Sequence, residues 1–406
     1  MESTPPLYTP SPPSPSYSTE LLPGEVTVVE SRRTSSQPRT GVFRRITDNV
    51  TLALRDQLPG NVQPSYGRNG LMRGQLTLRG SEDLVSVSLK LEGQLSVQIA
   101  GSSRTTVLFS NSYTMWEGSP SGPPCPHSIP FALFFPPTFR DGGQMRDLPP
   151  SFETPGNTAI CSYTLSVILS RQRKLLSLLK PSDNVTVAVR YHPRSRPQTP
   201  MLPSDLPFMS TVKSSPEEWH QVVCAMNSVQ SSSLAPIQCL LFIPAIQVYA
   251  LTDTIPFHLQ LRAPRPSMIS FLGQPQYSKT PSGSAGTGAG TAIRVYLLRQ
   301  TTIKLYESTT TTSRVLGEGK LRASQTKSPC CGEPAKDGLD ALDWEGEIRC
   351  SEDVTIASFA TSQAIVKDFI VLALTPTCPQ VSSLAPLKHY HPVRLVTDPW
   401  TDQTPP

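Results

Sequence analysis

Six histidines and eight cysteines are the side chains of this 406-residue chain best suited to catalysis or metal binding. A nucleophilic serine or cysteine needs a base in a defined local context, and no histidine occurs in a nucleophile-elbow or protease-type motif. His389 and His391 flank Tyr390 and would lie on one side of a strand. They could bind a metal, but without a third ligand nearby we expect a solvent-facing pair at the start of a strand instead. We therefore expect no catalytic, cofactor or metal site, and no enzyme.

The cysteines show no metal-binding or disulfide spacing. Cys330 and Cys331 are adjacent, and no Cys-x-x-Cys pair occurs. A zinc site needs closely paired ligands, and a disulfide scaffold needs a higher cysteine density than eight in 406 residues. We expect all eight to be reduced thiols.

The sharpest motif is Pro5-Pro6-Leu7-Tyr8, a Pro-Pro-x-Tyr sequence. WW domains bind such segments because a polyproline II helix forms at little entropic cost and its prolines stack in an aromatic groove. The tyrosine then fills a neighbouring pocket. Pro5, Pro6 and Tyr8 are thus predicted to bind a WW domain.

A basic cluster comprises Arg171, Arg173 and Lys174, with Arg190, Arg194 and Arg196 farther along. Such a cluster could contact acidic lipid headgroups or phosphorylated tails, which would bring the protein to a membrane surface. The alternative is a solvated hairpin turn, since such turns are commonly basic.

The elements that must position these residues are β-strands. Residues 1–40 are rich in Pro, Ser and Thr, which predicts a disordered tail. Residues 84–100 then alternate apolar and polar side chains with period two, as in a long strand or a hairpin bent at Gly93. Shorter alternating runs follow, with Gly- and Pro-rich turns between them. The pattern predicts an all-β chain of antiparallel, immunoglobulin-like sandwiches, the first spanning residues 41–193.

A Pro- and Ser-rich connector follows at residues 194–235. Ser215, Pro216 and Glu218 form a capping-box pattern, so we expect a short helix at 216–226. A second sandwich is predicted for residues 236–400, with strands that include 354–359. Loose insertions are expected near 274–290, which is Gly-rich, and near 308–345, which is polar.

Charge and hydropathy restrict the partners. The formal charge of +5 is spread over 36 basic and 31 acidic residues, unlike the concentrated basic stripe of nucleic-acid-binding proteins. No stretch reaches the roughly 18 apolar residues of a membrane span, and the N-terminus shows no secretory signal. We expect a cytoplasmic protein that does not bind nucleic acid.

Short segments spread in order over residues 40–400 carry a resemblance to a known family. They are residues 64–74 (PSYGRNGLMRG), 87–93 (VSLKLEG), 125–131 (CPHSIPF), 242–244 (FIP), 251–257 (LTDTIPF), 344–347 (WEGE), 366–371 (VKDFIV) and 391–398 (HPVRLVTD). Together they resemble the arrestin-like proteins of basidiomycete-type fungi. The resemblance implies two β-sandwich domains placed side by side.

The resemblance also implies a function. Fungal arrestin-like proteins recognise cytosolic tails of membrane transporters or receptors, and recruit a HECT-type ubiquitin ligase through Pro-Pro-x-Tyr motifs. The expected protein is therefore an adaptor for ubiquitination and endocytosis that is recruited to plasma membrane or endosomes. The alternative is an arrestin-fold sorting or signalling scaffold that works without a ligase. No residues of this sequence are matched to the buried ion-pair network of animal arrestins.

Overall fold

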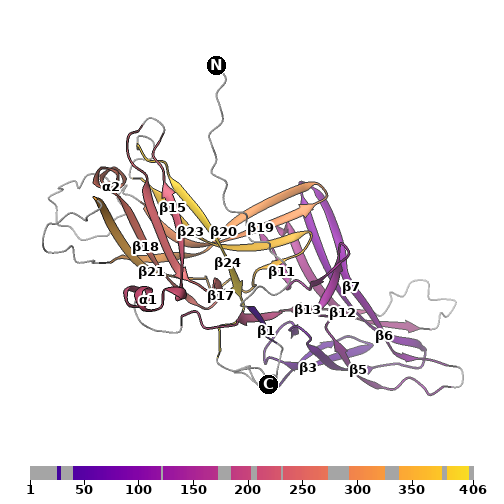
Figure 1. Cartoon of the computed structure of the whole chain (residues 1–406). Helices are drawn as coiled ribbons and strands as arrows, with labels where there is room; N and C mark the ends of the chain where they lie inside the picture. Colours follow the sequence, from indigo (N-terminus) through magenta and orange to yellow (C-terminus); the bar gives the residue numbers. More distant parts are fainter. Residues whose placement is uncertain are drawn as a thin grey trace, which may run out of the picture.

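The computed structural model describes residues 25–28, 40–119, 122–171, 184–202, 208–229, 232–272, 292–324, 338–376 and 382–401. Most of them form β-strands, so the predicted all-β class is confirmed (Figure 1). Neighbouring strands are antiparallel in nearly every described pair. The exceptions are the parallel pairs β4–β13 and β17–β24.

Two larger sheets form the part of the chain that we call the N-terminal half, residues 41–191. One runs in the order β4 (Ser65–Tyr66), β13 (Val185–Tyr191), β12 (Ala159–Arg171), β6 (Leu84–Ile99) and β7 (Ser102–Glu117), with β11 (Phe152–Glu153) beside β12. The other runs in the order β2 (Gly41–Ile46), β3 (Val50–Gln57), β5 (Leu71–Leu78) and β8 (Ser128–Phe134). A separate hairpin joins β9 (Thr138–Asp141) and β10 (Gln144–Asp147).

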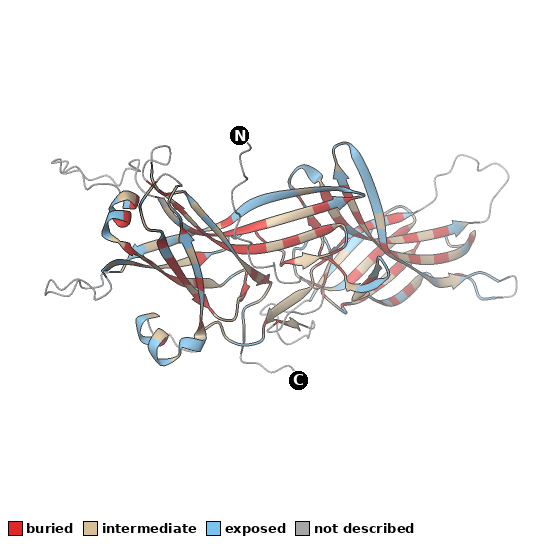
Figure 2. Ribbon diagram, turned by 45° about the horizontal axis from the view of Figure 1, so that its top comes forward, coloured by how far each residue is buried: buried red, intermediate tan, exposed pale blue. Residues whose placement is uncertain are grey.

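Residues of both sheets meet in one hydrophobic cluster. Along β6 every second side chain is buried, including Leu89, Leu91 and Leu95, and Figure 2 shows this alternation as banding along the strands. The period-two run at 84–100 is thus one long strand and not a hairpin. Gly93 marks a bulge opposite β7, and an added Cβ there would lie 2.6 Å from the ring of Tyr163.

A ten-stranded sheet forms most of the C-terminal half, residues 219–396. Its order is β15 (Trp219–Met226), β16 (Ile237–Pro244), β18 (Thr254–Pro264), β21 (Leu339–Arg349), β20 (Ser308–Ala323), β19 (Ala292–Leu305), β23 (Ala364–Thr375), β24 (Leu387–Val396) and β17 (Val248–Ala250), with β22 (Phe359–Ala360) beside β23. The short helices are α1 (Phe208–Ser214), α2 (Arg265–Leu272) and the 3-10 turns η1 (Pro155–Asn157) and η2 (Pro216–Glu218). A second large hydrophobic cluster fills this half.

The hairpin of β19 and β20 links the two halves. It reaches from the C-terminal half toward β6 and β7 (Figure 1). Ile303 and Leu305, near its tip, are buried in the hydrophobic cluster of the N-terminal half. Because a buried side chain removes its apolar surface from water, this insertion stabilises the contact between the halves.

The helix predicted at 216–226 is wrong. Only η2 is helical there, the Ser215 side chain makes no capping hydrogen bond, and residues 219–226 form β15 in register with β16. Val222 and Met226 face the core, whereas Trp219 lies on the other face, beneath Phe208 of α1. Because β15 buries residues on both faces, its apolar residues occur at a spacing that is also typical of a helix.

The insertion predicted at 308–345 is also largely wrong. Residues 308–323 form β20 and residues 339–349 form β21, while 325–337 lie outside the described residues. Most side chains of β20 are exposed, so the strand shows no apolar alternation. Its threonines nevertheless favour extended backbone. Conversely, residues 354–358 are not a strand, and only Phe359–Ala360 pairs with β23.

The predicted disordered tail contains a strand. β1 (Glu25–Val28) pairs antiparallel with β14 (Arg194–Pro197), because its Val and Thr side chains favour strand and the buried Glu25 finds a cationic partner in Arg394. Residues 1–24 and 29–39, and the insertion predicted near 274–290, lie outside the described residues. None of the described helices is long and apolar enough to cross a membrane.

Candidate functional site

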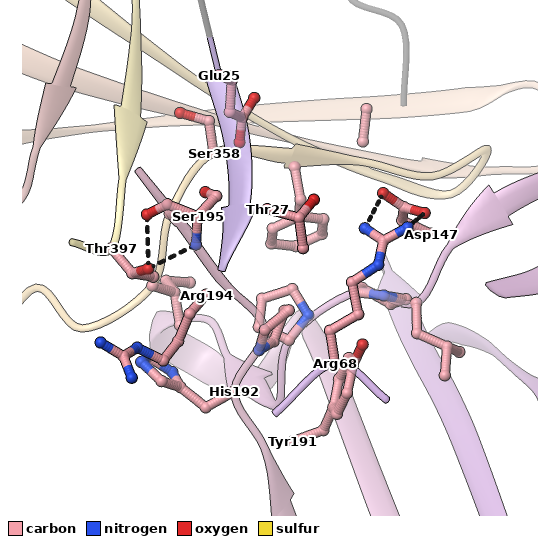
Figure 3. A pocket seen from close by; sticks show the side chains of 18 of the residues that line it. Glu25, Thr27, Arg68, Asp147, Tyr191, His192, Arg194, Ser195, Ser358 and Thr397 are labelled. Atoms are coloured by element: carbon pink, nitrogen blue, oxygen red, sulfur yellow. Dashed lines mark hydrogen bonds and ion pairs between the residues drawn. The ribbon is translucent and has the colours of Figure 1, made fainter. Parts of the chain in front are cut away.

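The two halves meet around a small cavity of about 80 Å³, here called the junction pocket (Figure 3). It is lined by β1, β14, the segment 356–360 and the residues around Asp147 and Tyr191. Strands from distant parts of the sequence therefore bring their charged side chains to one place. Among the described residues, four arginine–carboxylate pairs lie in or beside this pocket.

The pair Arg68–Asp147 belongs to the N-terminal half. Arg68 Nη1 and Nη2 donate to Asp147 Oδ2 and Oδ1, each at 2.8 Å, which is the bidentate geometry that makes such pairs strong. Tyr191 lies beside it. Burial raises the pKa of Tyr191, the Arg68 charge opposes this rise, and Asp147 adds to it. The phenol is thus held neutral at the pocket wall.

Glu25 and Arg394 connect the N-terminal strand β1 to β24. The Arg394 Nε and Glu25 Oε2 atoms are 3.1 Å apart, an ion pair without hydrogen-bond geometry, and Nη2 donates to Oε1 at 3.4 Å. The side chains are 14% and 2% exposed. A carboxylate so far removed from water needs a cationic partner, so this contact fixes the position of β1.

Arg194 and Asp398 connect β14 to the end of the C-terminal half. Arg194 Nε donates to both carboxylate oxygens, at 3.1 and 3.0 Å, and Thr397 Oγ1 donates to Oδ2 at 2.6 Å. Burial would raise the pKa of Asp398, but these hydrogen bonds outweigh it and lower the pKa. Thr397 Oγ1 also accepts from the Ser195 backbone N–H at 2.9 Å (Figure 3).

The most deeply buried pair is Arg299–Asp368, whose residues lie directly opposite each other on β19 and β23. Arg299 Nε and Nη2 donate to Asp368 at 2.7 and 2.9 Å, and Nη1 donates to the Ile356 carbonyl at 3.0 Å. Ser358 Oγ donates to Asp368 Oδ2 at 2.6 Å. Burial lowers the pKa of Arg299, but the attraction and hydrogen bonds of Asp368 outweigh this and raise it.

A larger hollow of about 550 Å³, here called the junction groove, lies between β11, β13, β19, β20 and the segment 353–356. Its apolar lining comes from Phe152, Leu316, Val354 and Val366, all buried. The rim carries exposed polar side chains, namely Glu153, Arg190, Thr312, Ser313, Arg314, Asp353 and Thr355. An apolar floor with a polar rim fits an extended peptide that places an apolar side chain inward.

The charged side chains of the rim differ in their interaction partners. Arg314 pairs with Asp353 on the surface. Arg190 donates to the Thr355 hydroxyl at 3.4 Å, a long contact between the halves. Its exposed guanidinium is the rim cation best placed to accept a carboxylate from a bound segment.

Some of the sequence-predicted site residues fall outside the described residues. These are Pro5, Pro6, Tyr8, Arg173 and Lys174. Arg171 is described, and it donates to the Gly80 carbonyl at 2.8 Å and pairs with Asp83. At least part of its charge is thereby neutralised within the N-terminal half. The related arginines Arg190 and Arg194 line the junction instead.

His389 and His391 lie on β24 and are half-buried, so the prediction of a solvent-facing pair is wrong. The ring of His391 lies 4.8 Å from that of His220 on β15, and its Nε2 lies 3.1 Å from Gln247 Oε1. Among the described residues no group of three or more His, Cys, Asp or Glu is placed to hold a metal ion. Burial, and then the charges of His220 and His389, lower the pKa of His391 to about 4.

Sequence reasoning missed the ion pairs of the junction, although one signal was present. Arg299 directly follows the apolar run 295–298, and Asp368 directly precedes the apolar run 369–374, so each charge interrupts the apolar pattern of its strand. Charges are rarely buried unless paired, so two such interruptions predict a pair. No comparable signal identifies Glu25 as the partner of Arg394, since 369 residues separate them.

No family model matches the chain, and no curated protein is similar to it.

Proposed function

We propose that the protein is a non-enzymatic, cytoplasmic adaptor of the arrestin-like kind. In this proposal each half is a β-sandwich, and the body binds the cytosolic tail of a membrane transporter or receptor. The Pro5-Pro6-Leu7-Tyr8 segment recruits a WW-domain HECT-type ubiquitin ligase. Ubiquitination and endocytosis of the cargo at the plasma membrane or endosomes follow.

The junction groove is the observation that carries the proposal. It has an apolar floor, a polar rim and the exposed cation Arg190, and both halves contribute to it. The β19–β20 hairpin holds the halves in a defined relation, because its Ile303 and Leu305 are buried in the cluster of the N-terminal half. The buried network of Arg299, Asp368 and Ser358 fixes the wall of the groove. Both features preorganise the groove and so lower the cost of binding. Such a buried network is also what the resemblance to arrestins would require.

The alternative is a sorting or signalling scaffold that uses the same groove and needs no ligase. The two functions differ in the role of Tyr8. A tail that binds WW domains supports the ligase adaptor, whereas cargo binding with no contribution from Tyr8 to ligase recruitment supports the scaffold.

The test titrates full-length protein against WW domains of HECT-type ligases and, separately, against peptides from cytosolic tails of membrane transporters. Tyr8→Ala should abolish WW binding of about micromolar affinity, because the tyrosine and the proline pair supply most of the roughly 8 kcal/mol involved. Tyr17→Ala, in the same tail but without a proline pair, is the matched control.

The second arm examines the groove. Arg190→Glu should weaken peptide binding at least tenfold and leave WW binding unchanged, while Arg140→Glu, an exposed arginine on β9, should change neither. Equal WW binding by wild type and Tyr8→Ala, or none by either, would rule out the ligase adaptor. Equal peptide binding by wild type and Arg190→Glu would rule out the groove as the cargo site.

A further inference from the structure

Two cysteines face each other at the edge of the ten-stranded sheet. β15 and β16 are paired in register from Trp219 opposite Pro244 to Met226 opposite Ile237, and Cys224 lies directly opposite Cys239. Directly opposed residues of an antiparallel pair project from the same face, with Cα atoms about 4.5 to 5.5 Å apart. That separation lies within the roughly 4.4 to 6.8 Å that a disulfide spans.

The two thiols differ in access and acidity. Cys239 is fully buried, whereas Cys224 is partly exposed between the exposed residues Val223 and Ala225. Interaction with Cys239 lowers the pKa of Cys224 despite the opposing effect of burial, and the same interaction raises the pKa of Cys239. Cys224 is thus the thiol that an oxidant reaches first, and the one that forms a thiolate more readily.

The other described cysteines lack this arrangement. Cys161 donates to the Tyr163 hydroxyl at 3.4 Å, and burial raises its pKa to about 12. Burial likewise raises the pKa of Cys350 to about 11. No other two of the described thiols lie opposite one another on paired strands. The arrangement is therefore specific to the edge strand β15.

We propose that Cys224 and Cys239 form a peroxide-sensitive dithiol that closes to a cross-strand disulfide. The Cys224 thiolate attacks one oxygen of hydrogen peroxide, the O–O bond breaks, and hydroxide leaves, so that Cys224 becomes a sulfenic acid. The Cys239 sulfur then attacks the Cys224 sulfur and a water molecule leaves. Overall, two thiols and one hydrogen peroxide give one disulfide and two waters.

The disulfide would act on the attachment of β15. This strand has β16 as its neighbour in the sheet, and its Trp219 holds α1 through the Trp219 Nε1–Thr211 Oγ1 hydrogen bond of 3.0 Å. A covalent link between β15 and β16 would prevent this edge from separating. Oxidation is therefore expected to stabilise the edge strand and the helix that it carries.

The experiment treats the folded full-length protein with hydrogen peroxide, blocks free thiols, and maps cross-linked peptides by mass spectrometry. Wild type and the control Cys350→Ser should both yield a Cys224–Cys239 link that a thiol reductant reverses. Cys239→Ser should stop at a sulfenic acid on Cys224, trapped by dimedone. The oxidised wild type should also unfold at a higher temperature than the reduced protein, a shift absent in Cys224→Ser.

The mapping on wild type decides the proposal even if a serine variant fails to fold. If peroxide oxidises Cys224 to sulfinic acid without the link, or if both thiols stay reduced while the peroxide is consumed elsewhere, the proposal is wrong. A link to any other cysteine in preference to Cys239 would equally overturn it.

Discussion

At the scale of single residues, substitutions of Arg299 and Asp368 test how strongly the stability of the protein depends on a buried ion pair. Both side chains are almost fully buried, and they are joined by two hydrogen bonds. Replacing one partner leaves the other charge buried and uncompensated, so Arg299→Met should lower the free energy of unfolding by about 3 to 5 kcal/mol. Urea unfolding of the purified protein measures this.

The matched control is Arg294→Met on the same strand. Arg294 pairs with Glu318, but both side chains are about half exposed, so its loss should cost about 1 kcal/mol or less. The double variant Arg299→Met/Asp368→Leu should recover most of the stability lost in the single variant, since it removes both buried charges. Equal losses from Arg299→Met and Arg294→Met would contradict the buried pair.

The cluster of His220, His389 and His391 predicts a pH dependence of stability. Each pKa is lowered chiefly by burial, that of His391 to about 4. Between a pKa of about 6.5 in the unfolded chain and 4 in the folded one, the unfolded state binds more protons. Stability is therefore fully present above about pH 6.5 and is lost as the pH falls toward 4.

The expected loss from His391 alone between pH 7.5 and 5 is on the order of 2 kcal/mol. His391→Gln should flatten the pH profile of the unfolding free energy in this window, while the exposed His127→Gln should leave it unchanged. A profile that is flat in the wild type would show that the imidazoles do not become buried and neutral on folding.

At the scale of elements, the sequence predicted the strands that bury only one face. β12, and β6 from Val87 onward, alternate between buried and less buried side chains because only one face meets the core, so the sequence shows period two in both strands. β20 is mostly exposed, and β15 buries residues on both faces, so neither alternates. Of the site, the sequence offered Arg190 and Arg194 as basic residues but not their partners, because cross-sheet neighbours depend on topology.

The strand β1 gives a prediction at this scale. It pairs with β14 over four residues, and its Glu25 is the buried partner of Arg394. A chain that lacks residues 1–28 should therefore be about 3 kcal/mol less stable than one that lacks residues 1–24, because only the first leaves Arg394 unpaired. Guanidinium titration of the two chains measures the difference, and identical midpoints would show that β1 does not dock in solution.

At the scale of the whole molecule, contacts of two kinds hold the junction together. The ion pairs Glu25–Arg394 and Arg194–Asp398 fix the strands around the junction pocket, and they set geometry more than they add stability. The hairpin of β19 and β20 instead buries apolar side chains in the core of the other half. We therefore expect this hairpin to make the unfolding of the two halves cooperative.

The hairpin tip tests that expectation. Ile303 and Leu305 are each only 2% exposed, so the double variant Ile303→Ala/Leu305→Ala removes buried apolar volume at about 2 to 4 kcal/mol per site. Because the lost contacts cross between the halves, the N-terminal half should exchange its amide hydrogens faster while the core of the C-terminal half stays protected. Hydrogen exchange followed by mass spectrometry resolves the two halves, and Val315→Ala, exposed on β20, serves as the control. If both halves of the double variant lose protection equally, the two halves still unfold together without the hairpin contacts. The ion pairs of the junction, and not the hairpin, would then couple their unfolding. The junction groove, which needs both halves in place, should then be more sensitive to Arg299→Met than to the loss of Ile303 and Leu305.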